Sequence, residues 1–442
     1  MGLPLLLWHY AVTRHGRRFR SREALETWQD RRVRAHVGRV AARSSFYRGH
    51  WGSMALSEWT RFPLIDKVTM MANFDTLNTV GFSLDRVMAV ALEAETSRDF
   101  SPTVGSLTVG LSSGTSGNRG LFLVSPAERM AWAGSILAKL LPGSLLEEHR
   151  IAFFLRANSR LYETVGGRRI RFEFFDLFDE VSHHLSRLAT FQPDVLVAPP
   201  SMLRFIGAAI EEGRLQLGLK RLLAVAEVLD PLDEAILSRQ FGMPVHQVYQ
   251  CTEGFLASSC SLGTLHVNED LVVIQKDVLD PASGKFAPIV TDFSRLTQPI
   301  VRYRLDDVLT EKREPCACGS VFMALESIEG RCDDIFLLPG LDGGTLRPVF
   351  PDFIRRAVML ASGEISEYAV RQSSPDEVEV AFSAPPDLRA SIEGRIRSRF
   401  HELCERQRCL MPQLAFATMP PRAAGRKLRR VERAFQPEGR SD

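Results

Sequence analysis

The sequence predicts an α/β protein with a large, multi-layered N-terminal domain and a small α+β C-terminal domain. The chain has 442 residues, more than a single hydrophobic core usually serves. Up to about residue 255, short apolar runs typical of strands alternate with longer helical patterns. From about residue 335 a separate α+β unit follows, of roughly a hundred residues. Two domains are therefore expected.

The elements of the large domain follow from apolar periodicity and from Pro and Gly positions. Residues 21–48 have a helical pattern, and residues 62–79 indicate a proline-started turn and helix. In "SLTVGLSSGTSGNRGLFLVS", residues 106–125, a strand leads into a polar loop and a second strand follows. We then expect a helix over 128–141, a strand over 149–155, a strand and helix over 193–213, and strands within 219–227 and 243–250.

After residue 255 the pattern becomes rich in strands, with three apolar stretches over residues 264–276, 286–293 and 299–310. The last unit predicts a helix over 350–361, a strand over 376–384, a helix over 387–407 and a strand over 413–419. The second of these helices should bury one stripe, formed by Leu388, Ile392, Ile396, Phe400 and Leu403.

The loop "LSSGTSGNRG", residues 111–120, has the composition of an anion-binding loop. Gly114, Gly117 and Gly120 permit unusual backbone angles, and the hydroxyls of Ser112, Ser113, Thr115 and Ser116 add donors to the backbone N–H groups. The spacing is not that of a Walker loop, because no lysine follows the glycines. The residues alone leave two interpretations open, a phosphate-binding loop and a flexible surface turn.

Net charge is only +2, but both ends of the chain are basic. Residues 1–50 carry +8 and residues 388–442 carry +7. This pattern indicates either solvated helix faces or a docking surface for an acidic partner. Nucleic acid is not expected as a partner, because the basic ends lack interleaved aromatic residues.

The apolar stretch over residues 3–12 is too short for a stable membrane span, so we expect a buried or interfacial helix there. No export signal is recognisable, and the seven cysteines are unevenly spaced. We therefore expect a reducing, cytoplasmic compartment.

Five ordered motifs carry a resemblance to a known family. After the glycine-rich loop come "AVAEVLD" (224–230), "VYQCTEG" (248–254), "VRYRLDD" (301–307), "GRCDDIF" (330–336) and, in the tail, "GRKLRRV" (425–431). The set resembles the adenylate-forming enzymes, in particular the branch of phenylacetate-coenzyme A ligase and its deazaflavin-adenylating relatives. The resemblance covers the chain from about residue 62 to residue 431. It implies an N-terminal adenylation domain, residues 1–333, and a small mobile C-terminal lid domain, residues 334–442.

The resemblance implies specific roles in binding ATP and Mg²⁺. The loop from Ser112 to Gly117 would hold the β- and γ-phosphates, with Arg119 in place of the family's usual lysine. Tyr249 would stack on adenine, Thr252 would meet the α-phosphate and Glu253 would hold Mg²⁺. The backbone at Glu227 would border the adenine.

The ribose contacts and the catalytic cation also follow from the resemblance. Asp307 and Arg331 match the residues that reach the ribose, although Asp306 stands where the family has glycine and is a rival for Asp307. Asp333 occupies the hinge position about which the small domain would rotate. Lys427 matches the lysine that stabilises the adenylation transition state, with Arg426 as the alternative.

Three cysteines and one histidine have residue types suited to zinc. Cys316 and Cys318 lie on a tight turn, and Cys260 precedes His266 by a short segment. Three thiolates and an imidazole satisfy tetrahedral Zn²⁺, so a structural zinc site is predicted. Ordinary buried thiols are the alternative.

The resemblance implies an ATP-dependent acid–thiol ligase. A small carboxylic acid, with aryl acids such as benzoates or phenylacetate as the first class, would become an acyl adenylate and then a thioester. The acceptor would be the phosphopantetheine thiol of coenzyme A or of an acyl carrier protein, and the basic ends favour the acidic carrier protein. Two alternatives remain: AMP transfer to a non-thiol cofactor acceptor, and a degenerate nucleotide-binding protein.

Overall fold

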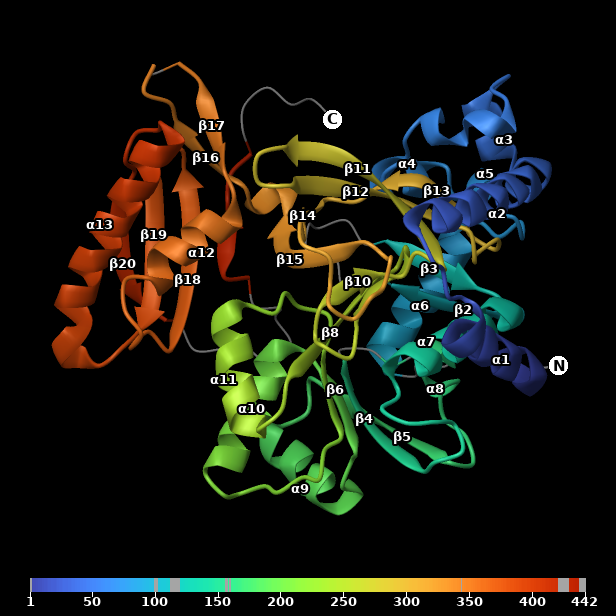
Figure 1. Cartoon of the computed structure of the whole chain (residues 1–442), viewed down its shortest axis with the longest axis horizontal. Coiled ribbons are helices and arrows are strands. Elements are labelled where there is room, and N and C mark those ends of the chain that lie inside the picture. The colour runs from blue at the N-terminus through green and yellow to red at the C-terminus, as the bar shows by residue number, and fades with distance from the viewer. Residues whose placement is uncertain are drawn as a thin grey trace. The chain divides into compact units, whose positions relative to one another are not determined.

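A computed structural model describes residues 2–98, 102–111, 120–155, 158, 160–342, 344–419 and 429–436. The chain divides into two compact units (Figure 1). Unit 1 comprises Met1–Leu305 and Thr310–Ser327, and unit 2 comprises Asp306–Leu309 and Ile328–Asp442. The boundary expected between residues 333 and 334 stays a prediction.

Unit 1 begins with helices, as the pattern over residues 21–48 predicted. The first helix, α1 (Gly2–Ala11), packs against α7 (Pro126–Leu140) so closely that a Cβ at Gly134 would lie 2.3 Å from the carbonyl oxygen of Leu6. The remaining helices of this region are η1 (Val12–Gly16), α2 (Arg22–Arg43), α3 (Ser45–Trp51), η2 (Leu56–Arg61), α4 (Lys67–Ala72), α5 (Phe74–Leu77) and α6 (Leu84–Ser97). Among the described residues, no helix combines the length and the apolar character that crossing a membrane requires.

The strands predicted on both sides of the glycine-rich loop are confirmed. They are β2 (Leu107–Leu111) and β3 (Leu121–Val124), which pair antiparallel, with β1 (Thr103–Val104) beside β2. Their buried side chains pack against α6, which the sequence analysis did not predict. The strands that flank the loop are thus paired with each other, with Leu111 opposite Leu121.

A twelve-stranded sheet forms the centre of unit 1, and its parallel half carries the predicted alternation of strands and helices. The order in this half is β8-β7-β6-β4-β5. The strands are β4 (His149–Leu155), β5 (Ile170–Asp176), β6 (Val195–Ala198), β7 (Arg221–Ala224) and β8 (Val245–Cys251). The connecting helices are α8 (Arg160–Glu163), α9 (Val181–Phe191), α10 (Pro200–Glu211) and α11 (Pro231–Phe241).

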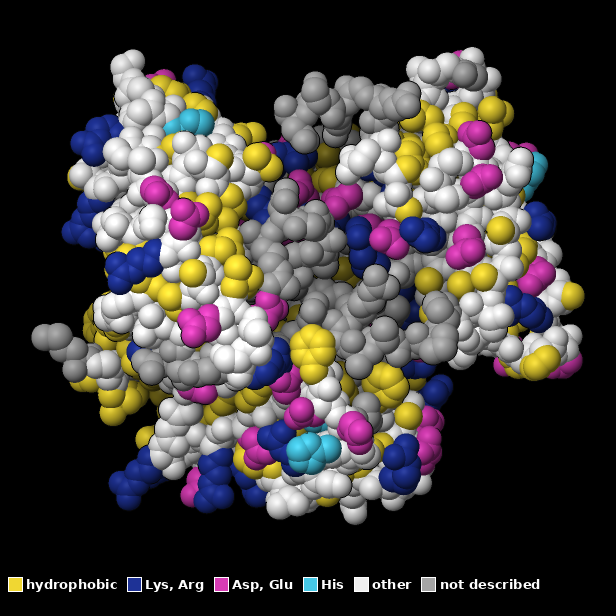
Figure 2. All heavy atoms as spheres, turned by 180° about the vertical axis from the view of Figure 1, so that it is seen from behind, with side chains coloured by type: hydrophobic (Ala, Val, Ile, Leu, Met, Phe, Trp, Pro, Cys, Tyr) yellow, Lys and Arg dark blue, Asp and Glu magenta, His cyan; other side chains and the backbone are white. Residues whose placement is uncertain are grey.

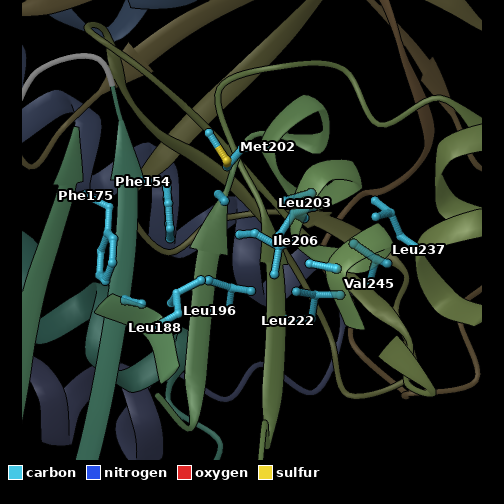
Figure 3. Close-up of a cluster of buried hydrophobic side chains, with 14 of the residues drawn as sticks. Phe154, Phe175, Leu188, Leu196, Met202, Leu203, Ile206, Leu222, Leu237 and Val245 are labelled. Carbon is cyan, nitrogen blue, oxygen red and sulfur yellow. The ribbon is translucent and has the colours of Figure 1, made fainter. Parts of the chain in front are cut away.

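The strands of this parallel half are apolar on both faces, and the two faces pack differently. On one face, Leu196 and Leu222 join residues of α9, α10 and α11 in a closely packed core (Figure 3). On the other face, Val195 and Leu223 point toward α7 and α8 and line a cavity. Because successive side chains of a strand point to opposite faces, one apolar run contributes both to the packed core and to the lining of the cavity.

The strand-rich region predicted after residue 255 is also confirmed. It forms the rest of the same sheet, in the order β11-β12-β14-β15-β10-β9-β8, with β13 beside β12. The strands are β9 (Gly254–Ser259), β10 (Leu265–Val267), β11 (Val272–Asp280), β12 (Lys285–Asp292), β13 (Ile300–Arg304), β14 (Asp307–Glu311) and β15 (Ala324–Arg331). The division between the units falls within β14 and β15.

Unit 2 is a small α+β fold, as predicted. Its sheet has the order β20-β19-β18-β21, and a separate hairpin pairs β16 with β17. In α13 the predicted stripe is buried from Ile392 onward, whereas Leu388 lies before the helix and is half-exposed. The elements are η3 (Cys332–Asp334), β16 (Phe336–Pro339), β17 (Leu346–Val349), α12 (Pro351–Met359), β18 (Glu367–Ser374), β19 (Glu377–Ser383), η4 (Pro386–Leu388), α13 (Arg389–Gln407), β20 (Gln413–Thr418) and β21 (Val431–Arg433).

Candidate active site

Three predicted nucleotide residues lie at the end of β8 and in the turn that follows it. The register of β8 with β9 shifts between Tyr249 and Gln250, and the chain then turns through Thr252 and Glu253. The Thr252 hydroxyl donates to Glu253 Oε2 at 2.9 Å, and Glu253 is buried, with 7% of the residue exposed. The turn therefore holds a hydroxyl and a carboxylate next to each other at the carboxyl end of a central strand, where α/β sheets bind ligands.

A segment that the sequence analysis overlooked, residues 292–298, contacts this turn, and we call it the bridging segment. A guanidinium N–H of Arg295 donates to the Thr252 carbonyl oxygen. Two further nitrogens of Arg295, Nε and Nη2, are buried without a hydrogen-bond partner among the described residues. Arg295 therefore places a cation with spare donors beside Thr252, where an anionic ligand would find them.

Asp292 adds a buried carboxylate to the same region. The backbone N–H and hydroxyl of Ser294 donate to Asp292 Oδ1 at 2.8 and 2.6 Å. Burial raises the pKa of Asp292, and the charge of Arg295 opposes that rise. The other oxygen lies so close to Gly254 that a Cβ there would be 3.1 Å from it, which favours glycine after Glu253.

Glu128 fastens the bridging segment to the start of α7. Its carboxylate accepts hydrogen bonds from the N–H and hydroxyl of Ser125, both at 2.8 Å, within the capping box of the helix. It also accepts from the N–H of Leu296, and from the N–H of Thr297 at 2.8 Å and its hydroxyl. Burial opposes the charge, but these hydrogen bonds prevail and leave the pKa of Glu128 below its usual value.

Gln298 fastens the same segment to the hairpin of the glycine-rich loop. Its buried amide accepts from the N–H of Leu123 at 2.8 Å and donates to the carbonyl oxygen of Leu121 at 3.0 Å, so it pairs with β3 as a neighbouring strand would. The bridging segment thus connects β3, α7 and the Thr252–Glu253 turn. The predicted phosphate contacts Ser112, Ser113, Gly114, Thr115, Ser116, Gly117 and Arg119 lie outside the described residues.

Glu227 contributes a structural contact in addition to its predicted place beside the adenine. Its carboxylate accepts from the backbone N–H and the hydroxyl of Ser201, each at 3.0 Å, at the start of α10. A carboxylate at a helix N-terminus satisfies free N–H groups and interacts favourably with the helix dipole. The preceding residue, Ala226, has a positive φ of 65°, so the chain turns sharply here.

A cavity of about 130 Å³ lies between the parallel strands and α7. Most of the lining is aliphatic, and four aromatic side chains, Trp132, Phe153, Tyr162 and Phe172, complete it. It extends to Ala226 and Gln250, the chain neighbours of Glu227 and Tyr249. Among the residues that the structure describes, no charged side chain lines it. The cavity thus offers an apolar compartment that reaches the predicted nucleotide residues.

Two apolar stretches of the sequence, residues 152–163 and 199–207, are candidates for the walls of a substrate pocket. In the first, Phe153 and Tyr162 line the cavity. In the second, Met202, Leu203 and Ile206 belong to the packed core on the opposite face of the sheet (Figure 3). Apolar periodicity shows that a helix face is buried, but it does not show against which face of a sheet.

The four predicted zinc ligands come together in unit 1. Their ligand atoms, from Cys260, His266, Cys316 and Cys318, all lie within 4.8 Å of one another. The Cys260 and Cys316 sulfurs are 3.9 Å apart, and Cys318 Sγ is 3.5 Å from His266 Nε2. With usual bond lengths, a tetrahedral zinc requires about 3.8 Å between two sulfurs and about 3.5 Å between sulfur and nitrogen. The donor set therefore fits Zn²⁺ in both type and spacing.

The orientation of His266 also suits a metal ligand. Its Nδ1 is 3.0 Å from the carbonyl oxygen of Phe322, which accepts a hydrogen bond when Nδ1 carries the proton. That tautomer leaves Nε2, the atom nearest Cys318, free to coordinate a metal. The described cysteines form no disulfides, so all three thiols are available.

The predicted ribose residues belong to unit 2. Asp306 Oδ2 lies 3.5 Å from Arg331 Nη2, and Asp333 Oδ1 lies 3.6 Å from Arg331 Nε. Asp307 begins β14 and is half-buried, whereas Asp306 is exposed. Because Asp306 lies next to Arg331, it stays a candidate for the ribose contact, as does Asp307.

The described part of the tail resumes next to the predicted hinge. Arg429 forms an ion pair with Asp334, and Arg433 donates to the carbonyl oxygen of Asp333. Burial raises the pKa of Asp334 to about 6, although the charge of Arg429 lowers it in part. Lys427 and its alternative Arg426 lie outside the described residues.

Known proteins resemble this chain in fold and, over part of its length, in sequence. No protein family model matches. A phenylacetate-coenzyme A ligase of Thermus thermophilus is 26% identical over 194 residues, which are 38% of this chain and 42% of that protein. The match thus spans less than half the length of that relative.

Several solved structures match over most of the chain. A 2-hydroxyisobutyryl-CoA ligase in complex with 2-HIB-AMP has a TM-score of 0.68 at 17% identity, with 92% of this chain and 88% of that chain covered. An acyl acid amido synthetase has a TM-score of 0.55 at 15% identity, with 90% and 86% covered. These matches confirm the resemblance inferred from the five motifs: the chain has the fold of the adenylate-forming ligases and is similar in sequence to a phenylacetate-coenzyme A ligase.

Proposed function

We propose that this protein is an ATP-dependent acid–thiol ligase that activates an aromatic carboxylic acid. In the first half-reaction a carboxylate oxygen of the acid bonds to the α-phosphorus of ATP, and the bond from that phosphorus to pyrophosphate breaks. In the second, a thiol sulfur bonds to the acyl carbon, AMP leaves with the bonding electrons, and the thiol proton passes to solvent. The main support is the apolar cavity that ends beside the predicted nucleotide residues.

The size and lining of the cavity favour an aromatic or similarly compact apolar acid. An apolar protein cavity of about 150 Å³ binds benzene, so a cavity of about 130 Å³ is of the right order for one ring. Aromatic walls such as Phe153 and Phe172 offer the edge and face contacts that aromatic groups prefer. Since no described residue brings a charged side chain into the cavity, the carboxylate of the acid would remain outside it, toward Ala226 and Gln250.

The turn after β8 would stabilise the charges of adenylation. Tyr249 would stack on the adenine, Thr252 would donate its hydroxyl to the α-phosphate, and Glu253 would hold Mg²⁺. When bound, Mg²⁺ screens the phosphate oxygens from the attacking carboxylate. Arg295, fixed on the Thr252 carbonyl, adds donors that the sequence analysis did not foresee.

The ribose would be held by Asp307 and Arg331, with Asp306 as the alternative acid. Lys427 would neutralise the charge shared by the acid and the α-phosphate, with Arg426 as its alternative. Both half-reactions would then use one site in turn, with the small domain rotating about Asp333 between them.

The acceptor would be the phosphopantetheine thiol of coenzyme A or of an acyl carrier protein. A 2-hydroxyisobutyryl-CoA ligase shares the fold, which supports a coenzyme A thioester as product. The basic charge at both ends of the chain supports an acidic carrier protein. Acceptor competition between coenzyme A and a phosphopantetheinylated carrier protein, measured as AMP release, decides between them.

We also propose that Cys260, His266, Cys316 and Cys318 hold a structural Zn²⁺. The supporting observation is the match between the measured ligand separations and those of a tetrahedral zinc site. The ion would cross-link the turn after β9 to the turn before β15. It would take no part in the chemistry, because all four positions are filled by protein ligands.

ATP–pyrophosphate exchange over a panel of aryl, branched and linear acids tests the proposal. We expect exchange with benzoate- or phenylacetate-like acids and little with long fatty acids. Val197→Phe, which fills the cavity, should raise KM for the aryl acid at least about tenfold, while the same substitution at exposed Val278 should leave it unchanged.

Two results would count against the proposal. Absence of exchange with every acid would favour a protein that binds nucleotide without chemistry, whereas thiol-independent accumulation of an adenylated product would favour AMP transfer to another acceptor. Exchange that survives Lys427→Ala would overturn the assignment of the catalytic cation.

A further inference from the structure

The first helix of the chain exposes an apolar face. Leu3, Pro4, Leu7, Trp8 and Ala11 are all exposed, and their spacing places them on one side of α1. The exposed fractions are 66% for Leu3, 46% for Leu7 and 65% for Trp8. Figure 2 shows hydrophobic side chains gathered at the edge of unit 1 that carries α1. Contiguous exposed apolar surface of this kind usually marks an interaction site.

The fold already uses the opposite side of α1. Leu6 is buried, and the helix packs tightly against α7. A helix that is apolar all round is normally buried all round. Here the described part of the chain covers only one side of α1. The face formed by Leu3, Leu7 and Trp8 therefore remains available to an apolar binding partner outside the described part of the chain.

Positive charge accumulates next to this face. Arg17 and Arg32 both act on His9 of α1, and with burial as the larger cause they lower its pKa. Burial, together with the charges of Arg17, Arg39 and Arg31, also lowers the pKa of Arg32. Arg17 and Arg32 therefore lie near α1, with Arg31 and Arg39 near Arg32. Arg17 pairs with Asp270, at 3.4 Å between Nη1 and Oδ2.

Several of these guanidinium groups have no carboxylate to pair with among the described residues. Arg31, Arg32 and Arg39 are exposed and form no ion pair in the described part of the chain, and the same holds for Arg18, which directly follows Arg17 in the sequence. Residues 1–50 as a whole carry eight more basic than acidic side chains. An apolar helix with tryptophan and adjoining arginines is the pattern of a segment that lies in the interface of an anionic membrane.

We propose that α1, with its adjoining arginines, docks this protein on an anionic lipid bilayer, with Leu3, Leu7 and Trp8 inserted at the headgroup level. The helix lies along the surface and does not cross it. The phosphate groups of the lipids take the place of carboxylate partners for Arg18 and Arg32. This inference does not depend on the proposed ligase activity.

Co-sedimentation of the full chain with vesicles tests the proposal. We expect binding to vesicles of phosphatidylcholine with phosphatidylglycerol and little binding to phosphatidylcholine alone. Trp8 emission should shift to shorter wavelength on binding, measured as the difference between wild type and Trp8→Phe. Raising salt to several hundred millimolar should weaken binding, because the charge contribution is screened.

Matched variants separate the apolar and the charged contributions. Leu3→Ser/Leu7→Ser should abolish sedimentation, whereas Leu146→Ser/Leu410→Ser, which changes leucines of similar exposure elsewhere, should not. Arg18→Gln/Arg32→Gln should lower the partition coefficient roughly tenfold or more. Arg371→Gln/Arg395→Gln removes two exposed arginines from unit 2 and should have a much smaller effect.

Three results would overturn the proposal. The first is equal binding to neutral and anionic vesicles. The second is wild-type sedimentation of the Leu3→Ser/Leu7→Ser variant when circular dichroism shows it to be folded. The third is a dimer in analytical ultracentrifugation that the same variant dissociates and that does not bind vesicles, because the apolar face would then pair two copies of the chain.

Discussion

Glu128 offers the sharpest test of how the candidate site is held together. Glu128→Gln keeps the size of the side chain but replaces one acceptor oxygen by an amide donor. Oε1 accepts from the N–H groups of Leu296 and Thr297, and Oε2 accepts from the N–H of Ser125 and from the hydroxyls of Ser125 and Thr297. Whichever oxygen the amide replaces, at least one backbone N–H then faces another donor. We expect the bridging segment to detach from α7, because a donor opposite a donor cannot form a hydrogen bond.

The size of the effect follows from the contacts. Each carboxylate oxygen of Glu128 accepts at least two hydrogen bonds, and a hydrogen bond to a charged group contributes about 1.5–3 kcal/mol. Losing those of one oxygen, on a half-buried side chain, should lower the free energy of unfolding by about 3 kcal/mol. Since Arg295 reaches Thr252 from the same segment, we also expect KM for ATP to rise, by roughly tenfold.

Urea denaturation and ATP–pyrophosphate exchange measure these two effects. Glu147→Gln is the matched control, because Glu147 is exposed and accepts a backbone N–H from Ser144 at 2.9 Å; it should behave as wild type.

The pH dependence gives an independent check on Glu128. Its pKa is lowered on folding, so its stabilisation is present above 4.5, the usual value, and is lost as the pH falls through the folded pKa. The difference between wild type and Glu128→Gln should therefore shrink in acid. A Glu128→Gln variant with the wild-type free energy of unfolding and wild-type KM would refute the reasoning.

Three further predictions concern the proposed zinc site, the buried His36 and the cationic side chain of Arg295. Purified protein should contain about one zinc per chain by elemental analysis. The variant Cys260→Ser should lose the zinc, and the control variant Cys251→Ser should retain it. Equal zinc content in both variants would exclude the site. Burial lowers the pKa of His36 to about 3. The free energy of unfolding should therefore fall as the pH drops below 6.5, by about 2 kcal/mol at pH 5. In denaturation measured as a function of pH, His36→Phe should remove this decrease. Arg295→Met should raise KM for ATP more than it lowers kcat in exchange assays, and an unchanged KM would show that its free N–H groups do not meet the nucleotide.

Local patterns predicted much of the fold. Four strands of the parallel half (β4, β6, β7 and β8), the helix α10, the strands around the glycine-rich loop and the stripe of α13 from Ile392 follow from apolar periodicity. The main elements missed were α6, β5, α9 and α11 in unit 1 and β18 in unit 2. In β5, "IRFEFFD", arginine, glutamate and aspartate interrupt the apolar run at the edge of the sheet, which weakens the strand signal.

The residues of the candidate site could be predicted only in part from the sequence. The pattern Ser125-Pro-Ala-Glu128 is a capping-box signature, and it could have identified Glu128 as a helix-cap residue. It could not have shown that Glu128 also holds Leu296 and Thr297, because no local pattern relates residues so far apart. Arg295 gave no signal for the same reason.

The sequence by itself determined the α/β class, the order of the motifs and the residue types able to hold phosphate, Mg²⁺ or zinc, because these depend on composition and on spacing within short segments. Only the tertiary structure decided that the zinc ligands converge, that Gln298 pairs with β3, and that one face of the sheet leaves a cavity while the other is packed. A packed core and an apolar cavity need the same side chains. Only the three-dimensional arrangement of the helices decides where those side chains meet and where they leave space.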